Sequence, residues 1–179
     1  MGVKKIGIMI ASLTLVLVAF YYFYNTRELY GNDEASIIKV IKSFDSYSNK
    51  GIEILEINDF GNVRIVGFLS DNSPSYIEFN KNQKGNYKWS HIQPQDNVSF
   101  NMFVPFGERK MMFVTNYENE IAKMQVDING TTIEQSFNPY HATVTWVDFP
   151  QKNKDSYELR NWKYYDESGN LINENELFN

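Results

Sequence analysis

The longest apolar run of the chain extends from Ile6 to Tyr24 and contains no charged residue. As a helix rising about 1.5 Å per residue, these 19 residues cover about 28 Å, close to the ~30 Å hydrocarbon layer of a bilayer. A single span in lipid satisfies its backbone hydrogen bonds only as a helix. The pattern therefore predicts a transmembrane helix over residues 6–24, with the lipid bilayer as its partner.

The residues at the two ends of this run predict its orientation. Lys4 and Lys5 precede Ile6, and positive charge is retained on the cytoplasmic side of a membrane. We therefore expect residues 1–5 to form a cytoplasmic stub and the bulk of the chain to lie outside the cell membrane, as in a single-pass protein. Aromatic rings favour the headgroup layer. The predicted outer anchor residues are Phe20, Tyr21, Tyr22, Phe23 and Tyr24.

A cleaved secretory signal is the alternative interpretation of the same run. The apolar region of such a signal is usually about 7–15 residues long and is followed by small residues at the cleavage site. Here five bulky aromatic residues follow Ala19. The pattern favours an uncleaved anchor, and a protein secreted after cleavage remains the alternative.

After a polar stalk at residues 25–32, apolar residues recur with the period of a helix. Asn32 or Asp33 can cap this helix, since either side chain accepts hydrogen bonds from the first turn. The helix is expected to end near Ser46–Lys50. Its apolar stripe consists of Ile37, Val40, Ile41 and Phe44.

Four strand-like runs follow the helix and are separated by Asn, Asp, Gly and Pro residues, which favour tight turns. In the last run, alternation places Tyr87, Trp89 and His91 on one face, where we expect the helix to pack. Residues 33–93 are therefore expected to form a small α+β domain, with one helix on a four-stranded antiparallel meander. The predicted strands are Ile52–Ile57, Val63–Ser70, Tyr76–Lys81 and Asn86–Gln93, and one expected break is Asp71–Pro74.

Beyond a polar boundary at Gln93–Asn97, short runs alternate apolar and polar residues, and no helical period appears. Lys110–Thr115 is apolar on both faces, as expected of a strand buried in the centre of a sheet. Asn129–Gly130 is typical of a two-residue hairpin turn. These patterns predict an all-β domain over residues 97–173, followed by a polar tail at 174–179.

Some of these segments carry a resemblance to known families. The runs Val114-Thr115-Asn116, Ile121-Ala122-Lys123 and Ile128-Asn129-Gly130, with Tyr165-Asp166 and Gly169-Asn170-Leu171-Ile172, are similar to immunoglobulin-like modules on bacterial surfaces. The expected fold of residues 97–173 is therefore an Ig-like or fibronectin type III-like sandwich. The whole chain resembles single-pass membrane proteins of low-GC Gram-positive bacteria. That resemblance implies an extracytoplasmic location and gives no activity.

The charge balance changes once the predicted anchor is set aside. The chain has 17 basic and 22 acidic residues, and removing Lys4 and Lys5 leaves 15 basic residues against the same 22 acids. This acidic balance argues against nucleic acid as a partner. The chain has no cysteine, which excludes disulfides, thiolate zinc sites and cysteine nucleophiles.

A search for catalytic or cofactor motifs predicts no catalytic, cofactor-binding or metal-binding residue. The ten glycines form no G-x-G pair, and His91 and His141 stand in separate predicted domains, outside any metal-ligand motif. Acidic pairs such as Glu118 with Glu120 are expected to be solvated. The turn Asp166–Asn170 lacks the alternating acids of a calcium loop.

The last long strand contains one local conflict. If Tyr157 and Leu159 face the core, simple alternation places Trp162 and Tyr164 on the charged outer face. A β-bulge near Asn161 would return both rings to the core, and this is the favoured interpretation. The alternative is an exposed Trp162–Tyr164 platform that contacts an envelope protein or a glycan.

These patterns together predict a membrane-anchored, extracytoplasmic protein that acts as a noncatalytic interaction module of the cell envelope. The rival hypothesis is a wall-active hydrolase whose carboxylates converge only in the folded protein. Secretion after signal cleavage is the third.

Overall fold

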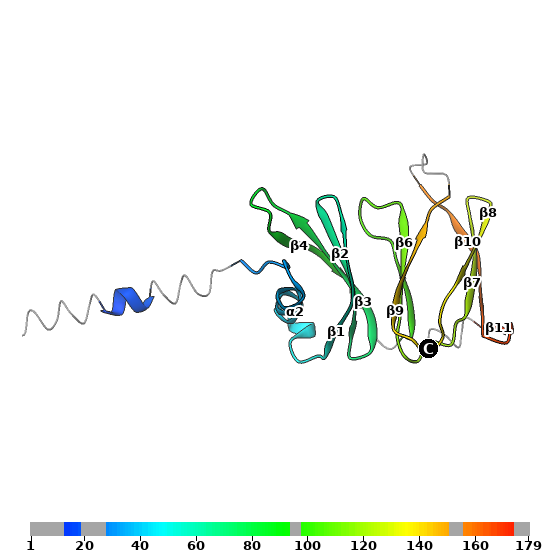
Figure 1. The fold of residues 1–179 in the computed structure, drawn as a ribbon, viewed down its shortest axis with the longest axis horizontal. Helices are drawn as coiled ribbons and strands as arrows, with labels where there is room; N and C mark the ends of the chain where they lie inside the picture. Colours follow the sequence, from blue (N-terminus) through cyan, green and yellow to red (C-terminus); the bar gives the residue numbers. More distant parts are fainter. Residues whose placement is uncertain (1–12, 19–27, 94–97, 151–155, 174–179) are drawn as a thin grey trace, which may run out of the picture.

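The computed structural model of the protein describes residues 13–18, 28–93, 98–150 and 156–173. In the folded part, a short helix precedes antiparallel strands in three sheets (Figure 1), so the expected helix, four-strand meander and further antiparallel strands are confirmed. The elements are helix α2 (Glu34–Lys42), a 3-10 turn (Asp45–Tyr47), β1 (Ile52–Phe60), β2 (Val63–Ser70), β3 (Ser73–Lys81), β4 (Tyr87–Gln93), β5 (Phe100–Phe103), β6 (Lys110–Thr115), β7 (Lys123–Ile128), β8 (Thr131–Ser136), β9 (Thr143–Asp148), β10 (Leu159–Tyr165) and β11 (Leu171–Ile172).

Helix α2 begins with a capping box at Asp33. The Asp33 carboxylate accepts a hydrogen bond from the backbone N–H of Ser36 at 2.8 Å, and the Ser36 hydroxyl accepts one from the Asp33 N–H at 2.9 Å. The helix ends at Lys42, earlier than expected, because the backbone at Phe44 is extended (ψ 133°) and the 3-10 turn follows.

Sheet A contains β1, β2, β3 and β4 in sequence order, each antiparallel to the next. The β2–β3 turn is shorter than the expected break at Asp71–Pro74. Asp71 and Asn72 both have positive φ (48° and 68°), as in a two-residue type I′ turn. Pro74 therefore lies within β3, where it pairs with Leu69.

A β-bulge in β4 corrects the expected face of His91. The register with β3 shifts between Glu78 and Phe79, so Trp89 lies opposite Phe79, His91 lies opposite Glu78, and Ser90 is the extra residue. Tyr87 packs in the core under helix α2, as expected. His91 faces the opposite side of sheet A.

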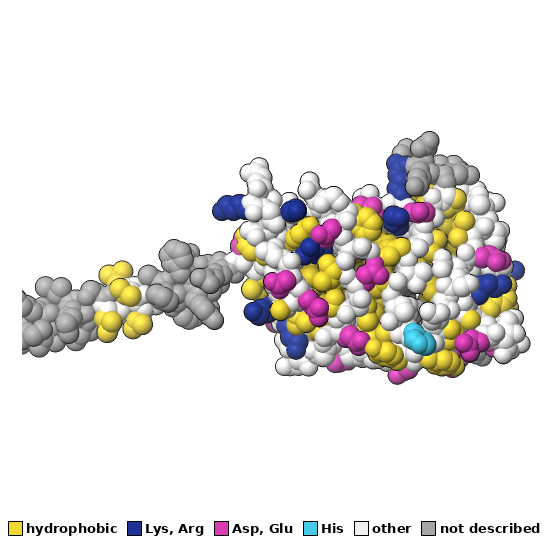
Figure 2. All heavy atoms as spheres, viewed as in Figure 1, with side chains coloured by type: hydrophobic (Ala, Val, Ile, Leu, Met, Phe, Trp, Pro, Cys, Tyr) yellow, Lys and Arg dark blue, Asp and Glu magenta, His cyan; other side chains and the backbone are white. Residues whose placement is uncertain are grey.

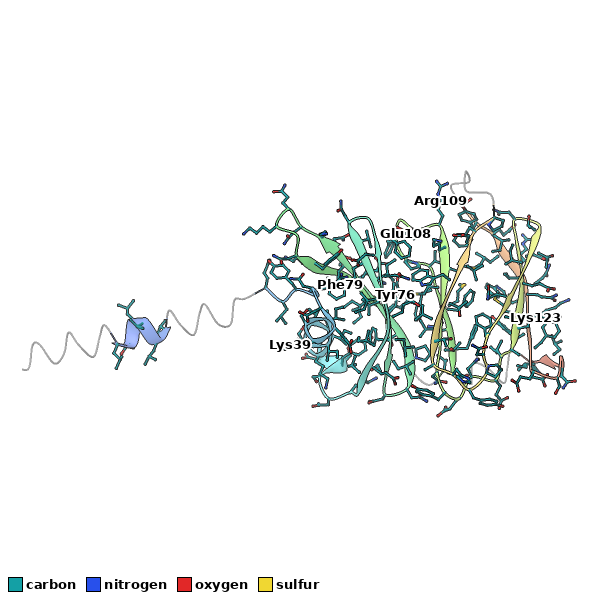
Figure 3. All side chains as sticks on the ribbon, viewed as in Figure 1. Lys39, Tyr76, Phe79, Glu108, Arg109 and Lys123 are labelled. Atoms are coloured by element: carbon teal, nitrogen blue, oxygen red, sulfur yellow. The ribbon has the colours of Figure 1, made fainter. Side chains whose placement is uncertain are left out.

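Both faces of sheet A are covered. On one side, helix α2 packs on a cluster that includes Val66, Phe68 and Phe79. On the other side, Ile65 and Tyr76 belong to a cluster that continues into sheet B. Figure 3 shows Phe79 on the helix side of sheet A and Tyr76 on the side of sheet B. The apolar residues of β2 and β3 therefore alternate between two cores.

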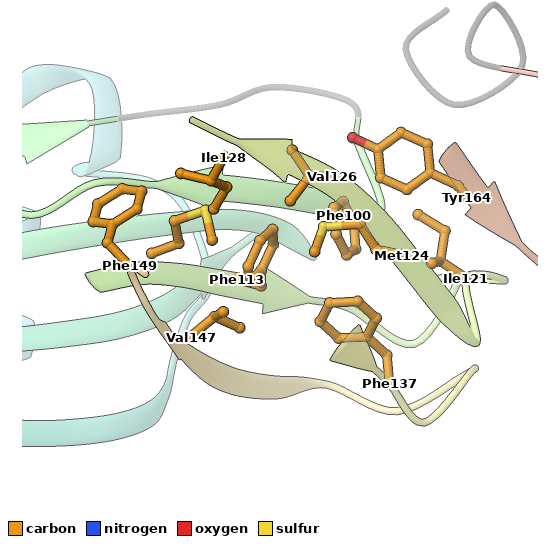
Figure 4. Packing of buried hydrophobic residues seen from close by; sticks show 11 residues of the cluster. Phe100, Phe113, Ile121, Met124, Val126, Ile128, Phe137, Val147, Phe149 and Tyr164 are labelled. Atoms are coloured by element: carbon orange, nitrogen blue, oxygen red, sulfur yellow. The ribbon is translucent and has the colours of Figure 1, made fainter. Parts of the chain in front are cut away.

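Sheet B (β5, β6, β9) and sheet C (β11, β10, β7, β8) pack face to face around a further apolar cluster (Figure 4). The central strand β6 contributes to both of its neighbouring cores. Met111 and Phe113 face sheet C, whereas Met112 and Val114 face sheet A. The sequence-based expectation that Lys110–Thr115 is buried on both faces is confirmed. The folded part is a stack of four layers: helix α2, sheet A, sheet B and sheet C.

Sheets A and B contact each other closely at several points. At one of these points, a Cβ atom added to Gly67 would lie 2.5 Å from Cγ2 of Val144. The rings of Tyr76 and Phe103 lie 4.7 Å apart between centroids. The indole N–H of Trp146 donates to a carboxylate oxygen of Glu56 at 2.8 Å. The segments expected as two separate domains therefore share a core.

Part of the expected stalk belongs to the folded body. The N–H of Gly31 donates to the carbonyl of Tyr87 (2.8 Å), and the N–H of Tyr87 donates to Asn32 Oδ1 (2.9 Å). The Arg64 guanidinium donates to the carbonyls of Gly31 (3.0 Å) and Asn32 (2.8 Å) and pairs with both oxygens of Asp59 (2.7 and 2.8 Å). We call this set of contacts the Arg64 clamp. It ties residues 31–32 to sheet A. The last two residues of the expected stalk at 25–32 therefore belong to the folded body.

The predicted anchor lies mostly outside the described residues, including Lys4, Lys5, Ile6, Phe20, Tyr21, Tyr22, Phe23 and Tyr24. Residues 13–18 are helical, and apolar side chains cover the surface of this segment (Figure 2). Among the residues that the structure describes, no helix has the length and apolar character to span a membrane.

Candidate functional site

A pocket of about 240 Å³ opens beside sheet A, on the face that turns toward sheet B. Strands β2, β3 and β4 supply its walls, and the β5–β6 loop supplies one exposed aromatic side chain. Its lining residues are Val63, Glu78, Asn80, Ser90, His91 and Phe106. We call it the Glu78 pocket. It combines one buried carboxylate with an imidazole, a phenyl ring and polar side chains.

Glu78 lines this pocket although it is only 3% exposed. It lies in β3 beside Tyr76 on the face toward sheet B, which places a charged residue between apolar ones. Its Oε1 accepts a hydrogen bond from the backbone N–H of Phe106 at 2.8 Å. Burial raises the pKa of the Glu78 carboxyl, because desolvation penalises the charged form, while the Phe106 N–H and His91 act in the opposite direction.

His91 reaches the pocket because of the β4 bulge. Its ring lies 5.5 Å from that of Tyr76 and 5.2 Å from that of Phe106, between centroids. Burial, together with the neighbouring Glu78 carboxylate, raises the pKa of the Tyr76 hydroxyl well above its usual range. His91 therefore forms the middle of a row of three rings that extends from the core to the surface.

The loop between β5 and β6 presents the outer ring of this row. Phe106 is 67% exposed, and Val104 in the same loop is also exposed. Gly107 follows with φ 79°, a conformation that glycine adopts at no steric cost. The hydrogen bond from the Phe106 N–H to buried Glu78 holds the backbone of the loop at this residue, and the exposed ring packs edge-on against His91.

The described neighbours of Glu78 compensate the negative charge of its carboxylate only weakly. Its described neighbours with an electrostatic influence on the pKa include His91, which lowers it, and Glu108, which raises it. Figure 3 shows Glu108 and Arg109 together at one end of β6. Within the described ranges, Glu78 forms no ion pair with a Lys or Arg side chain. The pocket therefore has the chemistry to accept hydrogen bonds from a cationic or neutral donor and to exchange a proton.

A second pocket of about 270 Å³ lies near the β2–β3 turn, lined by Gly51, Ile52, Glu53, Leu69, Asp71 and Asn72. Its acids already have protein partners. Asp71 accepts from the N–H of Gly51 at 2.7 Å, and Glu53 accepts from the Tyr117 hydroxyl at 2.7 Å. These contacts give the acids a structural role, so this pocket is the weaker candidate.

Trp162 and Tyr164, the residues considered for partner contact, lie at the predicted bulge. Asn161 has a φ of 55°, and the register of β10 with β7 shifts between Arg160 and Lys163, which confirms the bulge. Tyr164 is 6% exposed in the core between sheets B and C (Figure 4), and Trp162 packs against the same core, partly buried. The Tyr164 ring is thus not available as half of a surface platform.

The other residues weighed for chemistry lie apart from each other. His141 is exposed in the β8–β9 connection, where Nδ1 lies 2.7 Å from the carbonyl oxygen of Pro139. Glu118 and Glu120 are exposed, and Asp166 closes its own turn by accepting from the N–H of Asn170 at 2.8 Å. In the part of the chain that the structure describes, no group of three His, Asp or Glu side chains is placed to hold a metal ion.

Sequence reasoning missed Glu78 and Phe106. The signal for Glu78 was present, since a single acid inside the apolar run Tyr76-Ile77-Glu78-Phe79 is unusual for a buried strand. Phe106 had no comparable signal, because only the packing of sheets A and B brings its loop over β3.

Comparison with protein-family models, with curated proteins and with solved structures finds no match for the chain.

Proposed function

We propose that the protein is a noncatalytic binding module of a bacterial cell envelope, tethered by residues 6–24 with its N-terminus in the cytoplasm. The apolar run without charge and the preceding lysines support the tether and its orientation. The exposed apolar side chains of residues 13–18 are consistent with a segment that requires a lipid environment.

The observation that carries the binding function is the exposed Phe106 ring at a pocket, where its backbone is bound to buried Glu78 and its ring packs against His91. A large aromatic ring that is both exposed and positionally fixed is typical of contact sites, because little conformational entropy is lost when a partner covers it. We therefore assign the partner contact to Phe106 and not to Trp162 and Tyr164. An envelope protein or glycan remains the proposed partner.

The immunoglobulin-like character of sheets B and C is part of the same proposal. It is supported by their face-to-face packing around an apolar core and by their antiparallel hairpins. Such sandwiches present loops at both ends for binding, and the β5–β6 loop with Phe106 is one of these loops.

Site-specific photocrosslinking in intact cells tests this function. p-Benzoylphenylalanine is placed at Phe106, and the matched control carries it at Tyr140, which is also exposed but lies in the β8–β9 connection. We expect an adduct from position 106 and none from position 140. Equal adducts at both positions, or none at position 106, would contradict a contact at this loop.

Two measurements on the same cells test the tether. Protease treatment of protoplasts is expected to digest the folded body, and intact protein after treatment would reverse the proposed orientation. N-terminal sequencing is expected to give the uncleaved sequence. A mature N-terminus near residue 25 would identify the secreted alternative.

A hydrolase is the second candidate, and Glu78 is the observation that favours it. A carboxyl whose pKa is raised by burial can act as a general acid, and Glu108 supplies a second carboxylate near it. Release of reducing ends from purified cell wall by the full chain, abolished in Glu78→Gln, would support this function over binding alone.

A further inference from the structure

The Glu78 carboxylate has a chemical requirement that its described neighbours meet only in part. A carboxylate removed from water is costly unless a positive charge and hydrogen bonds compensate for it. Glu78 receives a backbone hydrogen bond from Phe106 and a side-chain hydrogen bond from the Tyr76 hydroxyl, but in the described part of the chain no Lys or Arg side chain lies within ion-pair distance. A ligand that brings a positive charge would complete the site.

The pocket wall shows where such a charge would lie. Glu78 lines the inner part, and Phe106 offers a broad apolar face at the mouth. Asn80 and Ser90 add an amide carbonyl and a hydroxyl oxygen, both of which accept hydrogen bonds from an ammonium group. An acidic inner end and an apolar outer face match a cation carried at the end of an aliphatic chain.

The size of the pocket restricts the ligand further. Sites for drug-sized molecules usually have about 300–1,000 Å³, and this pocket has about 240 Å³. It suits the end of a chain better than a whole drug-sized molecule. A primary ammonium has three N–H donors, which the carboxylate and the rim oxygens can accept, whereas a quaternary ammonium has none.

We propose that the Glu78 pocket binds a protonated primary alkylamine, with its ammonium on the Glu78 carboxylate and its alkyl chain against the Phe106 ring. This inference rests on the proposed binding function and names the ligand chemistry of the same site. The amine can belong to a small molecule or to a lysine side chain of a partner, and the experiment has an arm for each source.

Binding is expected to depend on the protonation of Glu78. The ionised carboxylate binds the ammonium, so affinity rises with pH as the carboxyl loses its proton. The titratable groups that face Glu78 are Tyr76 in β3, His91 in β4 and Glu108 in the β5–β6 loop. A His91→Gln variant removes the facing group whose positive charge would compete with the ligand, and it is expected to bind the amine at least as tightly.

The test uses the full chain in detergent micelles and titration calorimetry with butylammonium chloride. Its neutral counterpart is 1-butanol, which has the same alkyl chain without the charge, and the lysine arm uses Nα-acetyl-lysine methylamide. We expect butylammonium to bind and 1-butanol not to bind. Glu78→Gln is expected to weaken butylammonium binding about tenfold or more. Phe106→Ala is expected to weaken it about threefold.

Gln at position 78 keeps an oxygen acceptor for the Phe106 N–H, and Phe106→Ala changes an exposed side chain, so both variants are expected to fold. Tyr117→Ala, an exposed aromatic residue on another loop, is the matched control and should bind like the wild type. Equal affinity for butylammonium and 1-butanol, or unchanged affinity in Glu78→Gln, would overturn the proposal. Tighter binding of the lysine derivative than of butylammonium would indicate a protein partner, and the reverse would indicate a small amine.

The two proposals can fail separately. A specific crosslink at position 106 without amine binding would overturn the ligand class and leave the binding function in place. Amine binding without a crosslink in cells would leave the ligand class in place and contradict a macromolecular partner at this loop. Absence of both would overturn both.

Discussion

Substitution of Gly67 by alanine tests whether sheets A and B form one folded unit. Gly67 lies in β2 on the face toward sheet B, and an added Cβ atom would lie 2.5 Å from Cγ2 of Val144 and 3.5 Å from Cγ2 of Val114. Carbon atoms pack at about 3.5–4.0 Å, so the sheets must separate locally by about 1 Å. Sheet A cannot yield easily, because its other face is packed against helix α2.

The expected cost of Gly67→Ala is about 1–3 kcal/mol, the range for an overpacked core. For a folded unit of this size, each kcal/mol lowers the melting temperature by about 2–4 °C. Differential scanning calorimetry of the full chain in micelles should show one unfolding transition, shifted down in the variant. Two transitions, with only the one from sheet A affected, would indicate two independent domains.

A second substitution separates the steric clash from other effects of the alanine. Val144→Ala removes two methyl groups and is expected to cost about 1–2 kcal/mol by itself, at ~0.8 kcal/mol per group. In the double variant the added methyl group occupies the space that Val144 leaves. The losses in free energy of unfolding of the two single variants should therefore add up to more than the loss in the double variant, by about 0.5–3 kcal/mol. Strict additivity would refute the close packing at this point.

Three further predictions follow from charges and close contacts. Because burial raises the pKa of Glu78, its contribution to stability is complete below the pKa of the unfolded chain and is lost as pH rises through the folded-state pKa. Urea denaturation at pH 5 and pH 8 should therefore show Glu78→Gln more stable than the wild type at pH 8, and a less stable variant there would show that the carboxylate is stabilising. Hydrogen bonds from Arg64, then from Tyr87, lower the pKa of Asp59, so its contribution is present above the unfolded-state pKa and is lost as pH falls through the folded-state value. Asp59→Asn should accordingly destabilise the protein at pH 7 and lose that effect in acid, and an equal effect at both pH values would contradict the ion pair. Gly31→Ala places Cβ 2.3 Å from Cε1 of the buried Phe79 ring. The substitution should therefore lower the free energy of unfolding by about 1–3 kcal/mol and accelerate hydrogen exchange at the amide of Tyr87. Unchanged exchange would contradict the contact.

The elements of the fold could be predicted because alternation and turn residues are local signals. The hairpin at Asn129–Gly130, with φ of 51° and 82°, is one example, since few other residue pairs adopt this turn. The double-sided burial of Lys110–Thr115 is another. What covers the second face of that strand could not be predicted, because sheet A lies far away in the sequence and alternation carries no information about partners.

The candidate site was hidden for a related physical reason. The extra residue at Ser90 reverses the side of His91, and no residue of β4 is a glycine or proline that would mark a bulge. The contact of Glu78 with Phe106 joins positions 28 residues apart through the packing of two sheets. The Asn161 bulge could be predicted, because two large aromatic rings would otherwise have faced water.

The Arg64 clamp has a mechanical consequence for a tethered protein. Six residues lie between Tyr24 and Gly31, so the chain between them has seven Cα–Cα steps, each spanning at most about 3.5 Å when fully extended. If residues 6–24 form the proposed anchor, the chain between this anchor and the clamp is no longer than about 25 Å, which would keep the folded body close to the lipid surface. A force on a bound ligand would then be transmitted to this linker through the hydrogen bonds of the Arg64 guanidinium and the Tyr87 backbone. These hydrogen bonds would be loaded before helix α2.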